Sequence, residues 1–554
     1  MSVVQAMLGA TRQVVQGMFR RRDPQNLMFE TVHLLPEEKR VRLEKSWAHA
    51  YREQALPLVK EEPFAPLYDA ANGRPNAPVQ VVLSVLLLKE LHGLTDMEAL
   101  EQLEFSLLWQ HALRLSPEQA HLCQKTLHNF RVKLIEHGAA RLAFEEITAG
   151  IVKALGIRLD RQRLDSTHIL SNFALLTRLG LFCETLRVGL AALRRAHPRL
   201  FGRLPEELRS RYLKDDGTET RYRDAKSDEA KRRLDVCARD VYCVLELCNG
   251  KSAAKLEEIG LLQRLFDDQC EVVEKERKPG ANDEDAGQGG APVVVKEPKT
   301  ISSASLQTPH DPDATYSGHK GKGYEVQIAE TCHEENEVEI ITHVEVTPSC
   351  EGDSGTLLPA LEDLTRRDLQ PAELVADTTY GSAANVVEAA RRGTDLVSPV
   401  GGAGSEEVVA EDSKDRPLTV GDFKVDLQLA KPAVCPAGFE SISQRSLGRP
   451  LNTVELRFDG AKCAACPLAK RCPAKRRSRG AEAAVRVSLE RANLEQRRRA
   501  EARGELRPRY KIRAGIEATN SELKRSHGLG KLRVRGKERV TLAVYFKALA
   551  CNVK

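Results

Sequence analysis

The segment Arg507–Gly530, RPRYKIRAGIEATNSELKRSHGLG, carries the most specific pattern of the chain. On a helix that advances ~100° per residue, Arg513 lies at about −60°, Glu517 at about −20° and Lys524 at about −40° from Tyr510. These four polar residues therefore share a stripe roughly 60° wide over about four turns. One carboxylate among two cations and a phenol suits a site that holds a metal and a phosphate together.

The nearest other carboxylate does not belong to this stripe. Glu522 points to about +120° on the same helix, which is the opposite side. A solvated face would not require the four residues to gather, and a face packed in a hydrophobic core would not tolerate them. We therefore interpret the stripe as functional.

Two aspartates upstream stand in strand-like surroundings. Segment Gly156–Leu170 alternates polar and apolar residues like a pair of strands, and Asp165 is expected at the end of the first core strand. Asp377 directly follows an expected buried strand, Glu373–Ala376. A carboxylate at the carboxyl end of a strand lies where open α/β sheets place ligand sites. Asp160 could be the site residue in place of Asp165, although its LDRQR context is typical of a turn.

The stripe resembles a known family signature. Tyr510-x2-Arg513-x3-Glu517-x6-Lys524 matches, in identity and spacing, the Tyr-Arg-Glu-Lys signature of bacterial insertion-sequence transposases of the DDE superfamily. In that family the glutamate is catalytic, while the other three residues contact DNA phosphates near the transposon end. The resemblance therefore assigns a DNA-binding role to Tyr510, Arg513 and Lys524.

The same resemblance implies a catalytic triad of Asp165, Asp377 and Glu517. Thr378 and Thr379 are a mild departure, because the family often has small residues or glycine there. Two Mg²⁺ (or Mn²⁺) ions suit this chemistry, since a pair of divalent cations can act on both sides of a phosphorus. We expect Asp165 to bridge the two ions, with Asp377 and Glu517 each flanking one.

The resemblance also implies the activity and the partners. We expect a DNA transposase that cleaves double-stranded DNA at terminal inverted repeats and joins the ends to target DNA, assembled as a homodimer on DNA. The alternatives are a nuclease on the same scaffold without strand transfer, and a catalytically silent DNA-binding protein derived from a transposase. No G-x4-G-K-[ST] motif supports a phosphate-loop ATPase.

Alternating strands and helices predict an α/β fold for the middle of the chain. The resemblance implies a ribonuclease H-like (retroviral-integrase-like) core. Its first parts are expected at residues 151–171 and 311–401, and its C-terminal helical part, with Glu517, at 486–554. Three further segments are expected around it: a helical insertion at 172–277, a flexible linker at 278–310 and a Cys-rich insertion at 402–485. The Cys-bearing segment Gly401–Arg479 is expected to be irregular.

Within the core, apolar and polar patterning predicts individual elements. The expected strands are Tyr324–Thr331, Val338–Thr347, Glu373–Ala376 and Asp395–Val400. The expected helices are Gly355–Arg367 and Ser382–Arg392.

Residues 1–150 are typical of a helical domain. Helices are expected at Val79–His92 and Thr126–His137, with capping boxes at Thr95–Glu98 and again at Ser116–Gln119. Short helices with tight joints resemble a DNA-binding helix-turn-helix, and the alternative is a small bundle that only packs. The basic residues near the last expected helix are Lys125, Arg131 and Lys133.

Four cysteines cluster in the expected Cys-rich insertion. Cys435, Cys463, Cys466 and Cys472 could supply the ligands of a structural Zn²⁺. The spacing differs from that of the common zinc ribbon, and the alternative is four unrelated thiols in a loop. Related transposases carry a similar Cys-rich insertion, which favours the zinc site.

Composition limits the remaining classes of protein. The chain has 554 residues, 41% of them hydrophobic and 29% charged, and a formal net charge of +5. Basic residues outnumber acidic ones 16 to 6 from Arg491 to Val540, which indicates a polyanion partner. We expect no membrane span and no export signal, and hence a cytoplasmic protein whose 13 cysteines are thiols or metal ligands. The resemblance implies that this protein is bacterial and associated with the nucleoid.

Overall fold

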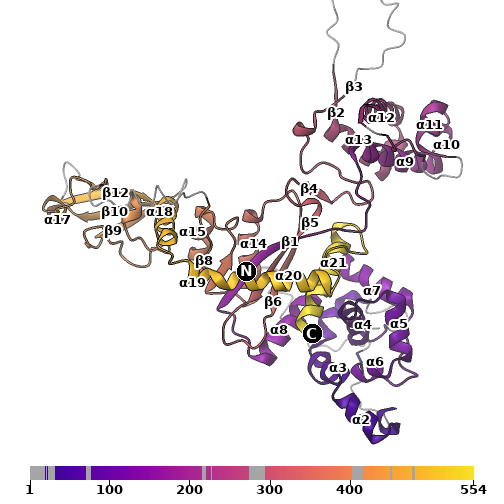
Figure 1. The fold of residues 1–554 in the computed structure, drawn as a ribbon, viewed down its shortest axis with the longest axis horizontal. Coiled ribbons are helices and arrows are strands. Elements are labelled where there is room, and N and C mark those ends of the chain that lie inside the picture. Colours follow the sequence, from indigo (N-terminus) through magenta and orange to yellow (C-terminus); the bar gives the residue numbers. More distant parts are fainter. Residues whose placement is uncertain are drawn as a thin grey trace, which may run out of the picture.

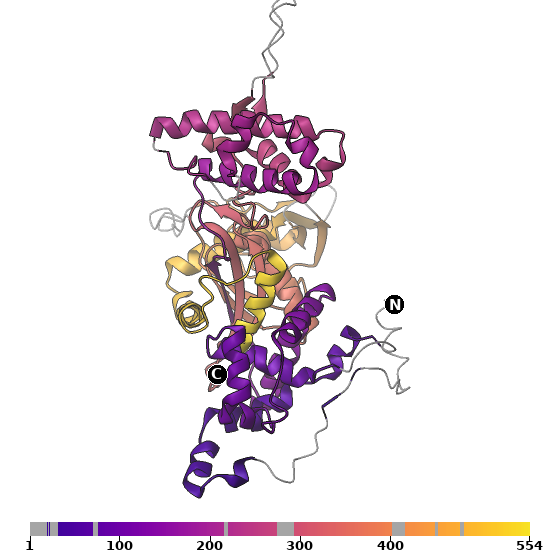
Figure 2. The same cartoon turned by 90° about the vertical axis from the view of Figure 1, so that its right-hand side faces the viewer.

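A computed structural model describes most of the chain. It covers residues 19, 21–22, 31–69, 76–214, 220–225, 227–273, 293–401, 416–448, 452–476 and 481–554. Figure 1 shows a central mixed sheet from which three further parts extend: the N-terminal helices, the helices that follow β1, and a smaller sheet. In Figure 2 the inserted helices, the central sheet and the N-terminal helices follow one another along the molecule.

The central sheet has six strands. They are β1 (Arg161–Ile169), β4 (Thr315–Ser317), β5 (Gly321–Thr331), β6 (Ile341–Pro348), β7 (Glu373–Ala376) and β8 (Asp395–Val397). β1 is parallel to β7, and β7 to β8, whereas β5 is antiparallel to β1 and also pairs with β4 and β6. The α/β prediction is confirmed, as are the predicted core strands to within a few residues at their ends.

The predicted pair of strands in Gly156–Leu170 is wrong. The segment forms the single strand β1, because its only turn, around Gly156–Asp160, precedes the alternating residues. Its hydrogen-bonding partners come from distant segments, β5 and β7. Asp165 is thus in the middle of this strand and not at its end.

Helices cover both faces of the central sheet. Leu164 and Ala329 pack against α14 (Leu357–Arg366) and α15 (Ala383–Arg391). Because successive residues of a strand point to opposite faces, Asp165 points to the other face. That face carries α20 (Gly515–Arg525) and α21 (Lys537–Val553).

The N-terminal helices share a hydrophobic core with the sheet and α21. They are α2 (Glu37–Glu44), α3 (Trp47–Ala50), α4 (Val79–Leu91), α5 (Asp96–Phe105), α6 (Leu107–Ala112), α7 (Gln124–Glu136) and α8 (Ala140–Leu155). The predicted helices at 79–92 and 126–137 are confirmed, and Thr95 and Glu98 form the predicted capping box. No helix begins at Ser116, where Gln119 closes only a turn. Residues 1–18, at the start of the expected domain, lie outside the described part.

The segment after β1 forms a separate helical body. Its elements are α9 (Arg178–Ala196), α10 (Pro198–Phe201), α11 (Glu206–Tyr212), α12 (Ser227–Cys248), α13 (Glu257–Gln269), β2 (Cys270–Val272) and β3 (Val293–Val295). These elements surround their own hydrophobic cluster. Part of the expected flexible linker, residues 278–292, lies outside the described residues. Its remainder is packed chain, because β3 pairs with β2 and Ser305–Thr308 are buried.

The Cys-bearing region is not irregular, contrary to its prediction. It contains a four-stranded antiparallel sheet of β9 (Ser443–Gly448), β10 (Thr453–Asp459), β11 (Lys475–Arg476) and β12 (Glu482–Ser488), with the short helix α17 (Gly460–Ala464). Apolar residues alternate along β10 and β12 and form a fourth hydrophobic cluster with α18 (Leu489–Ala502).

The signature segment is not one continuous helix. α19 (Arg507–Tyr510) leads into a 3-10 turn, Lys511–Ala514, and α20 follows. The first half of the predicted stripe therefore lies on a tighter helix than the second. Within the described residues, no helix is both long enough and apolar enough to cross a membrane.

Candidate active site

The backbones of Asp165 and Asp377 lie side by side, because β1 and the end of β7 are parallel neighbours in the sheet. The last pair between β1 and β7 is Leu164 with Ala376, and each aspartate is the next residue of its chain. Neighbouring strands lie about 4.8 Å apart, so the two backbones are adjacent at this point. The register of β1 and β7 thus brings together two aspartates that are far apart in the sequence.

The turn after β7 fixes the backbone of Asp377. Thr379 N donates to Asp377 Oδ1 at 2.8 Å, and Ser398 Oγ donates to the Asp377 carbonyl at 2.6 Å. Gly381 lies so close to Ser398 that a Cβ on it would be 2.1 Å from Ser398 Oγ. Arg497 of α18 donates to the carbonyls of Gly381 and Ser398 at 2.9 and 2.7 Å. A helix from the C-terminal region therefore holds the turn that carries Asp377.

Arg163 attaches α20 to the sheet. Its side chain is almost fully buried, and Nη1 donates to the Ile512 carbonyl at 2.9 Å just before α20. Nε bonds Glu330 of β5 at 2.5 Å, and Nη2 bonds Glu339. A Cβ on Gly515 would be 2.0 Å from Arg163 Nη1, so a side chain at this position would require Arg163 or α20 to move. The contact brings the start of α20 over β1, two residues from Asp165.

Arg513 joins the two ends of the candidate triad. Its Nη2 lies 3.0 Å from Asp165 Oδ2, and its Nη1 lies 3.2 Å from Glu517 Oε1. The Glu517 side chain is 67% exposed, whereas that of Asp165 is only 11% exposed. Glu517 is therefore the open side of the site, where a substrate can reach it.

The electrostatics show that the carboxylates act on one another. Burial raises the pKa of the Asp165 carboxyl, and the charge of Asp377 adds to this rise while Arg513 opposes it. Burial also raises the pKa of the Tyr510 hydroxyl; Arg513 opposes this rise, and Asp377, Asp165 and Glu517 add to it. Five of the six residues predicted for the site thus lie within electrostatic range of one another. They are Asp165, Asp377, Tyr510, Arg513 and Glu517.

The sixth predicted residue is not part of this group. Lys524 is exposed, and its side chain passes Gly530. Lys524 is the seventh residue after Glu517 along α20, which corresponds to about 10 Å of helix rise.

Asp160, the competing candidate, lies at the other end of the sheet. It precedes β1, where its carbonyl accepts from Glu373 N at 2.9 Å at the beginning of β7. Asp377 follows the end of β7. The length of β7 therefore separates Asp160 from the triad.

A second polar group near the site has no counterpart in the sequence analysis. Lys320, between β4 and β5, places Nζ 3.0 Å from Ser166 Oγ, 3.0 Å from Glu325 Oε2 and 3.4 Å from Asp353 Oδ2. Burial raises the pKa of the Tyr380 hydroxyl far above its usual range, and the charges of Asp353, Asp165 and Asp377 add to the rise. In the sequence, the only sign of a role for Lys320 was the cluster of basic residues HKGK at 319–322.

The donor set at the triad fits a hard divalent cation. Three carboxylates supply oxygen atoms, which Mg²⁺ and Mn²⁺ prefer. Asn520 Nδ2 lies 3.5 Å from Asp165 Oδ2, and its Oδ1 is buried without a hydrogen-bond partner among the described residues. The Arg513 guanidinium already occupies a cation position between Asp165 and Glu517.

The four clustered cysteines surround one cavity of about 330 Å³. Burial raises the pKa of the Cys463 thiol, and Cys435, Cys472 and Cys466 raise it further. In the described part of the chain, no three of these sulfurs all lie within 4.8 Å of one another, whereas three residues of another group do. The zinc site stays a prediction.

Two of the three basic residues near the last predicted helix of the N-terminal domain have partners within the protein. Arg131 pairs with both carboxylate oxygens of Asp96, and Lys133 Nζ lies 4.1 Å above the ring of Tyr68. Lys125 is exposed. This pattern leaves the DNA-binding role of this part a prediction.

Two segments of the chain match known sequence families. Residues 434–554, which include α20 and the four clustered cysteines, match the family described as Transposase DDE domain. Residues 48–133, in the N-terminal helices, match the family described as Transposase domain (DUF772). The chain matches no curated protein and no solved structure. A DDE domain implies a ribonuclease H-like core, and the observed mixed sheet with helices on both faces accommodates one.

Proposed function

We propose that this chain, with two regions that match transposase domains, is a DNA transposase of the insertion-sequence type. It cleaves double-stranded DNA at terminal inverted repeats and joins the ends to target DNA. Asp165, Asp377 and Glu517 are its catalytic carboxylates. The observation that carries this proposal is their convergence around Arg513 in a chain that matches a DDE domain.

The three carboxylates would hold Mg²⁺ or Mn²⁺. Bound divalent cations supply an activated hydroxyl nucleophile and stabilise the charge that develops on the leaving oxygen. Asp165 would be the buried ligand, with Asp377 beside it directly after the end of the neighbouring strand β7. Glu517 approaches from α20 on the open side.

Other residues of the chain bind and orient the DNA. Arg513 neutralises Asp165 and Glu517 in the free protein, and its guanidinium would be available to hold a phosphate where bound cations compensate the two carboxylates. Tyr510 borders the carboxylates and can donate to a phosphate oxygen. Lys524, further along α20, binds a more distant phosphate of the same backbone.

The first test compares single carboxylate variants on labelled DNA that carries the terminal repeats flanking the gene. Asp165→Asn, Asp377→Asn and Glu517→Gln should each abolish Mg²⁺-dependent cleavage and retain binding to the ends, because the amides keep shape and lose charge. Glu538→Gln, an exposed carboxylate at the start of α21, is the control and should cleave normally. A Glu517→Gln protein that still cuts would refute the triad.

The same assay separates this proposal from its alternatives. A transposase joins cleaved ends to a target duplex, whereas a nuclease on the same scaffold yields only cut ends. Wild-type protein that binds the ends and does not cut indicates a silent DNA-binding protein. The proposed homodimer is tested by measuring the mass of the complex on DNA that carries one end or two.

A further inference from the structure

Three residues with metal-ligating side chains meet behind the catalytic helix. Glu522 lies near the end of α20, His527 lies in the loop that follows, and Cys551 lies in the last turns of α21. One ligand atom from each of them comes within 4.8 Å of the other two. Among the described residues this is the one group of three that meets such a spacing.

His527 has a free ring nitrogen in a buried place. The residue is 2% exposed, and its Nδ1 lies 3.4 Å from the carbonyl oxygen of Glu90 in α4. A carbonyl oxygen only accepts, so Nδ1 carries the proton and Nε2 carries the lone pair. Nε2 is buried and has no hydrogen-bond partner in the described part of the chain. Histidines that ligate metals are commonly held in this way, with one nitrogen on a backbone carbonyl and the other on the ion.

We propose that Glu522, His527 and Cys551 bind a Zn²⁺ ion. Imidazole nitrogen, thiolate sulfur and carboxylate oxygen together are a donor set for zinc, whereas Mg²⁺ and Ca²⁺ prefer oxygen alone. Tetrahedral zinc places its ligand atoms closer than 4.8 Å, so the three side chains need only a small contraction.

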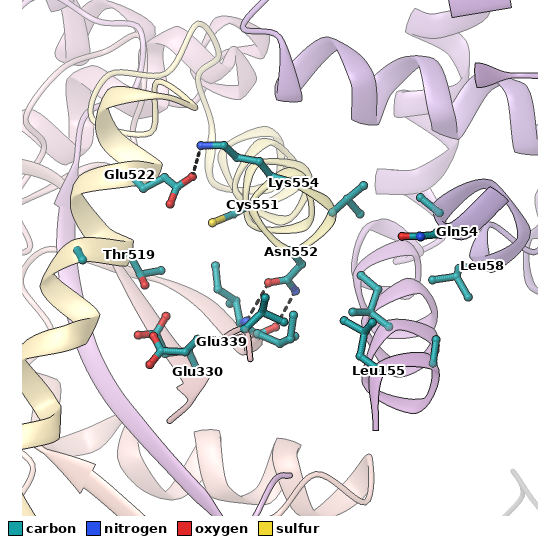
Figure 3. Close-up of a pocket in the computed structure, with 18 of the residues that line it drawn as sticks. Gln54, Leu58, Leu155, Glu330, Glu339, Thr519, Glu522, Cys551, Asn552 and Lys554 are labelled. Atoms are coloured by element: carbon teal, nitrogen blue, oxygen red, sulfur yellow. Dashed lines mark hydrogen bonds and ion pairs between the residues drawn. The ribbon is translucent and has the colours of Figure 1, made fainter. Parts of the chain in front are cut away.

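The surroundings leave room for a fourth ligand. Glu522 and Cys551 line a cavity of about 710 Å³ between α20, α21 and the N-terminal helices (Figure 3). The Cys551 sulfur points toward α20, where Glu522 lies. A water from this cavity completes the coordination, as in zinc sites with three protein ligands.

The local charge favours a cation at this place. Glu522 already attracts one, because Lys554 Nζ lies 2.7 Å from its Oε1. The Lys554 side chain is 56% exposed and flexible, so it can swing into solvent when an ion binds. Glu330, which lines the same cavity, adds a second carboxylate to the surroundings of Cys551.

This site is distinct from the proposed catalytic centre. Glu522 and Glu517 are five residues apart on α20, which places them about 140° apart around its axis. An ion held by Glu522 and Cys551 ties α20 to α21, and thereby supports the helix that carries Glu517. The inference does not depend on the proposed function, since it concerns metal binding alone.

The test measures zinc per chain in the full-length protein after equilibration with Zn²⁺ and removal of loose ions. Cys551→Ala and Glu522→Gln should each contain one zinc fewer than the wild type. Cys350→Ala is the matched control, because Cys350 is similarly half-buried and lies far from the trio in sequence, and it should lose none. The four clustered cysteines are intact in every variant, so their contribution cancels.

Co²⁺ provides a second readout. The wild type should show a sulfur-to-cobalt absorption band that decreases in Cys551→Ala and is unchanged in Cys350→Ala. If Cys551→Ala does not fold, as judged by circular dichroism, Glu522→Gln decides, because Glu522 is half-buried and its amide keeps the shape. Equal zinc content in the wild type and in the folded variants of the trio would overturn the inference.

Discussion

Arg513 contacts two carboxylates that come from distant parts of the chain, Asp165 of β1 and Glu517 of α20. In the free protein it compensates their charges, and in the proposed complex it holds a phosphate. We predict that Arg513→Gln lowers the rate of end cleavage roughly 10²-fold, as the loss of one positioned donor does in other active sites. Single-turnover cleavage at saturating protein measures this loss. An unchanged rate would show that the arginine serves only the free protein.

His343 offers a pH-dependent test of stability away from the site. It lies on β6, is 3% exposed, and its Nδ1 donates to Asp363 Oδ2 of α14 at 2.6 Å. Burial, together with the charges of Arg367 and Arg141, lowers the pKa of His343 to about 3. The folded protein therefore keeps this ring neutral, whereas the unfolded chain takes up a proton below its ordinary pKa of about 6.5.

The sign of the effect follows from linkage. The unfolded state binds more protons between pH 6.5 and 3, so His343 destabilises the folded protein increasingly as the pH falls through this window. We predict that His343→Gln loses less stability than the wild type between pH 7 and pH 5 in urea unfolding. His319→Gln, outside the buried core, is the control and should follow the wild type. Parallel pH profiles for all three proteins would contradict the prediction.

At the scale of elements, the junction of α20 with β1 depends on Gly515. Alanine normally stabilises a helix relative to glycine by about 0.5–1 kcal/mol. At Gly515 the new Cβ would meet Arg163 Nη1 at 2.0 Å, so α20 must move away from the sheet or Arg163 must leave its partners.

We therefore predict that Gly515→Ala costs about 1–3 kcal/mol of stability, as overpacking does, and also reduces cleavage by displacing Glu517. The matched change is Gly260→Ala in α13, where nothing lies within 4 Å of the added Cβ. That variant should be as stable as the wild type or more stable, with normal cleavage. Thermal unfolding and the end-cleavage assay distinguish the two outcomes, and equal effects at both glycines would refute the packing argument.

The elements also show what the sequence could and could not predict. Strands β5, β7 and β8 and helices α14 and α15 follow from local periodicity, because each buries one face or is buried throughout. The partners of β1 could not be predicted in this way, since strand register depends on residues far away in the chain. For the same reason Asp165 was expected at the end of β1. It lies within β1, and the strand that ends next to it is β7.

The Cys-bearing region shows a different reason for a missed element. Alternating apolar residues in TVELRFD and EAAVRVS mark β10 and β12, but the glycines, prolines and cysteines around them suggested an irregular loop. Asp353 and Tyr380 had no detectable signal, and Lys320 had only its basic neighbours, because the proximity of these residues to the site arises from turns rather than from a spacing along one element. The signature stripe, in contrast, was visible because its four residues lie close together in the sequence, on helical segments that directly follow one another.

At the scale of the whole molecule, the helical body between β1 and β4 has a core of its own. Its buried cluster is separate from the three other hydrophobic clusters, and α9 and α13 cross so closely at Gly189 that a Cβ there would be 2.5 Å from Leu262. Polar contacts join it to the sheet region, such as His310 Nε2 with Glu184 Oε1 at 2.7 Å. A body with its own core and a polar junction can unfold independently of its neighbours.

We predict that this body gives a separate calorimetric transition. Leu262→Ala removes a fully buried side chain from its core and should cost about 2–5 kcal/mol, which lowers the midpoint of that transition alone. Leu361→Ala, an equally buried change in α14 beneath the central sheet, should instead lower the transition of the sheet region. If either variant shifts the whole profile together, the inserted body and the sheet unfold as one cooperative unit. The polar junction would then be strong enough to transmit changes in the insertion to β1, and so to Asp165.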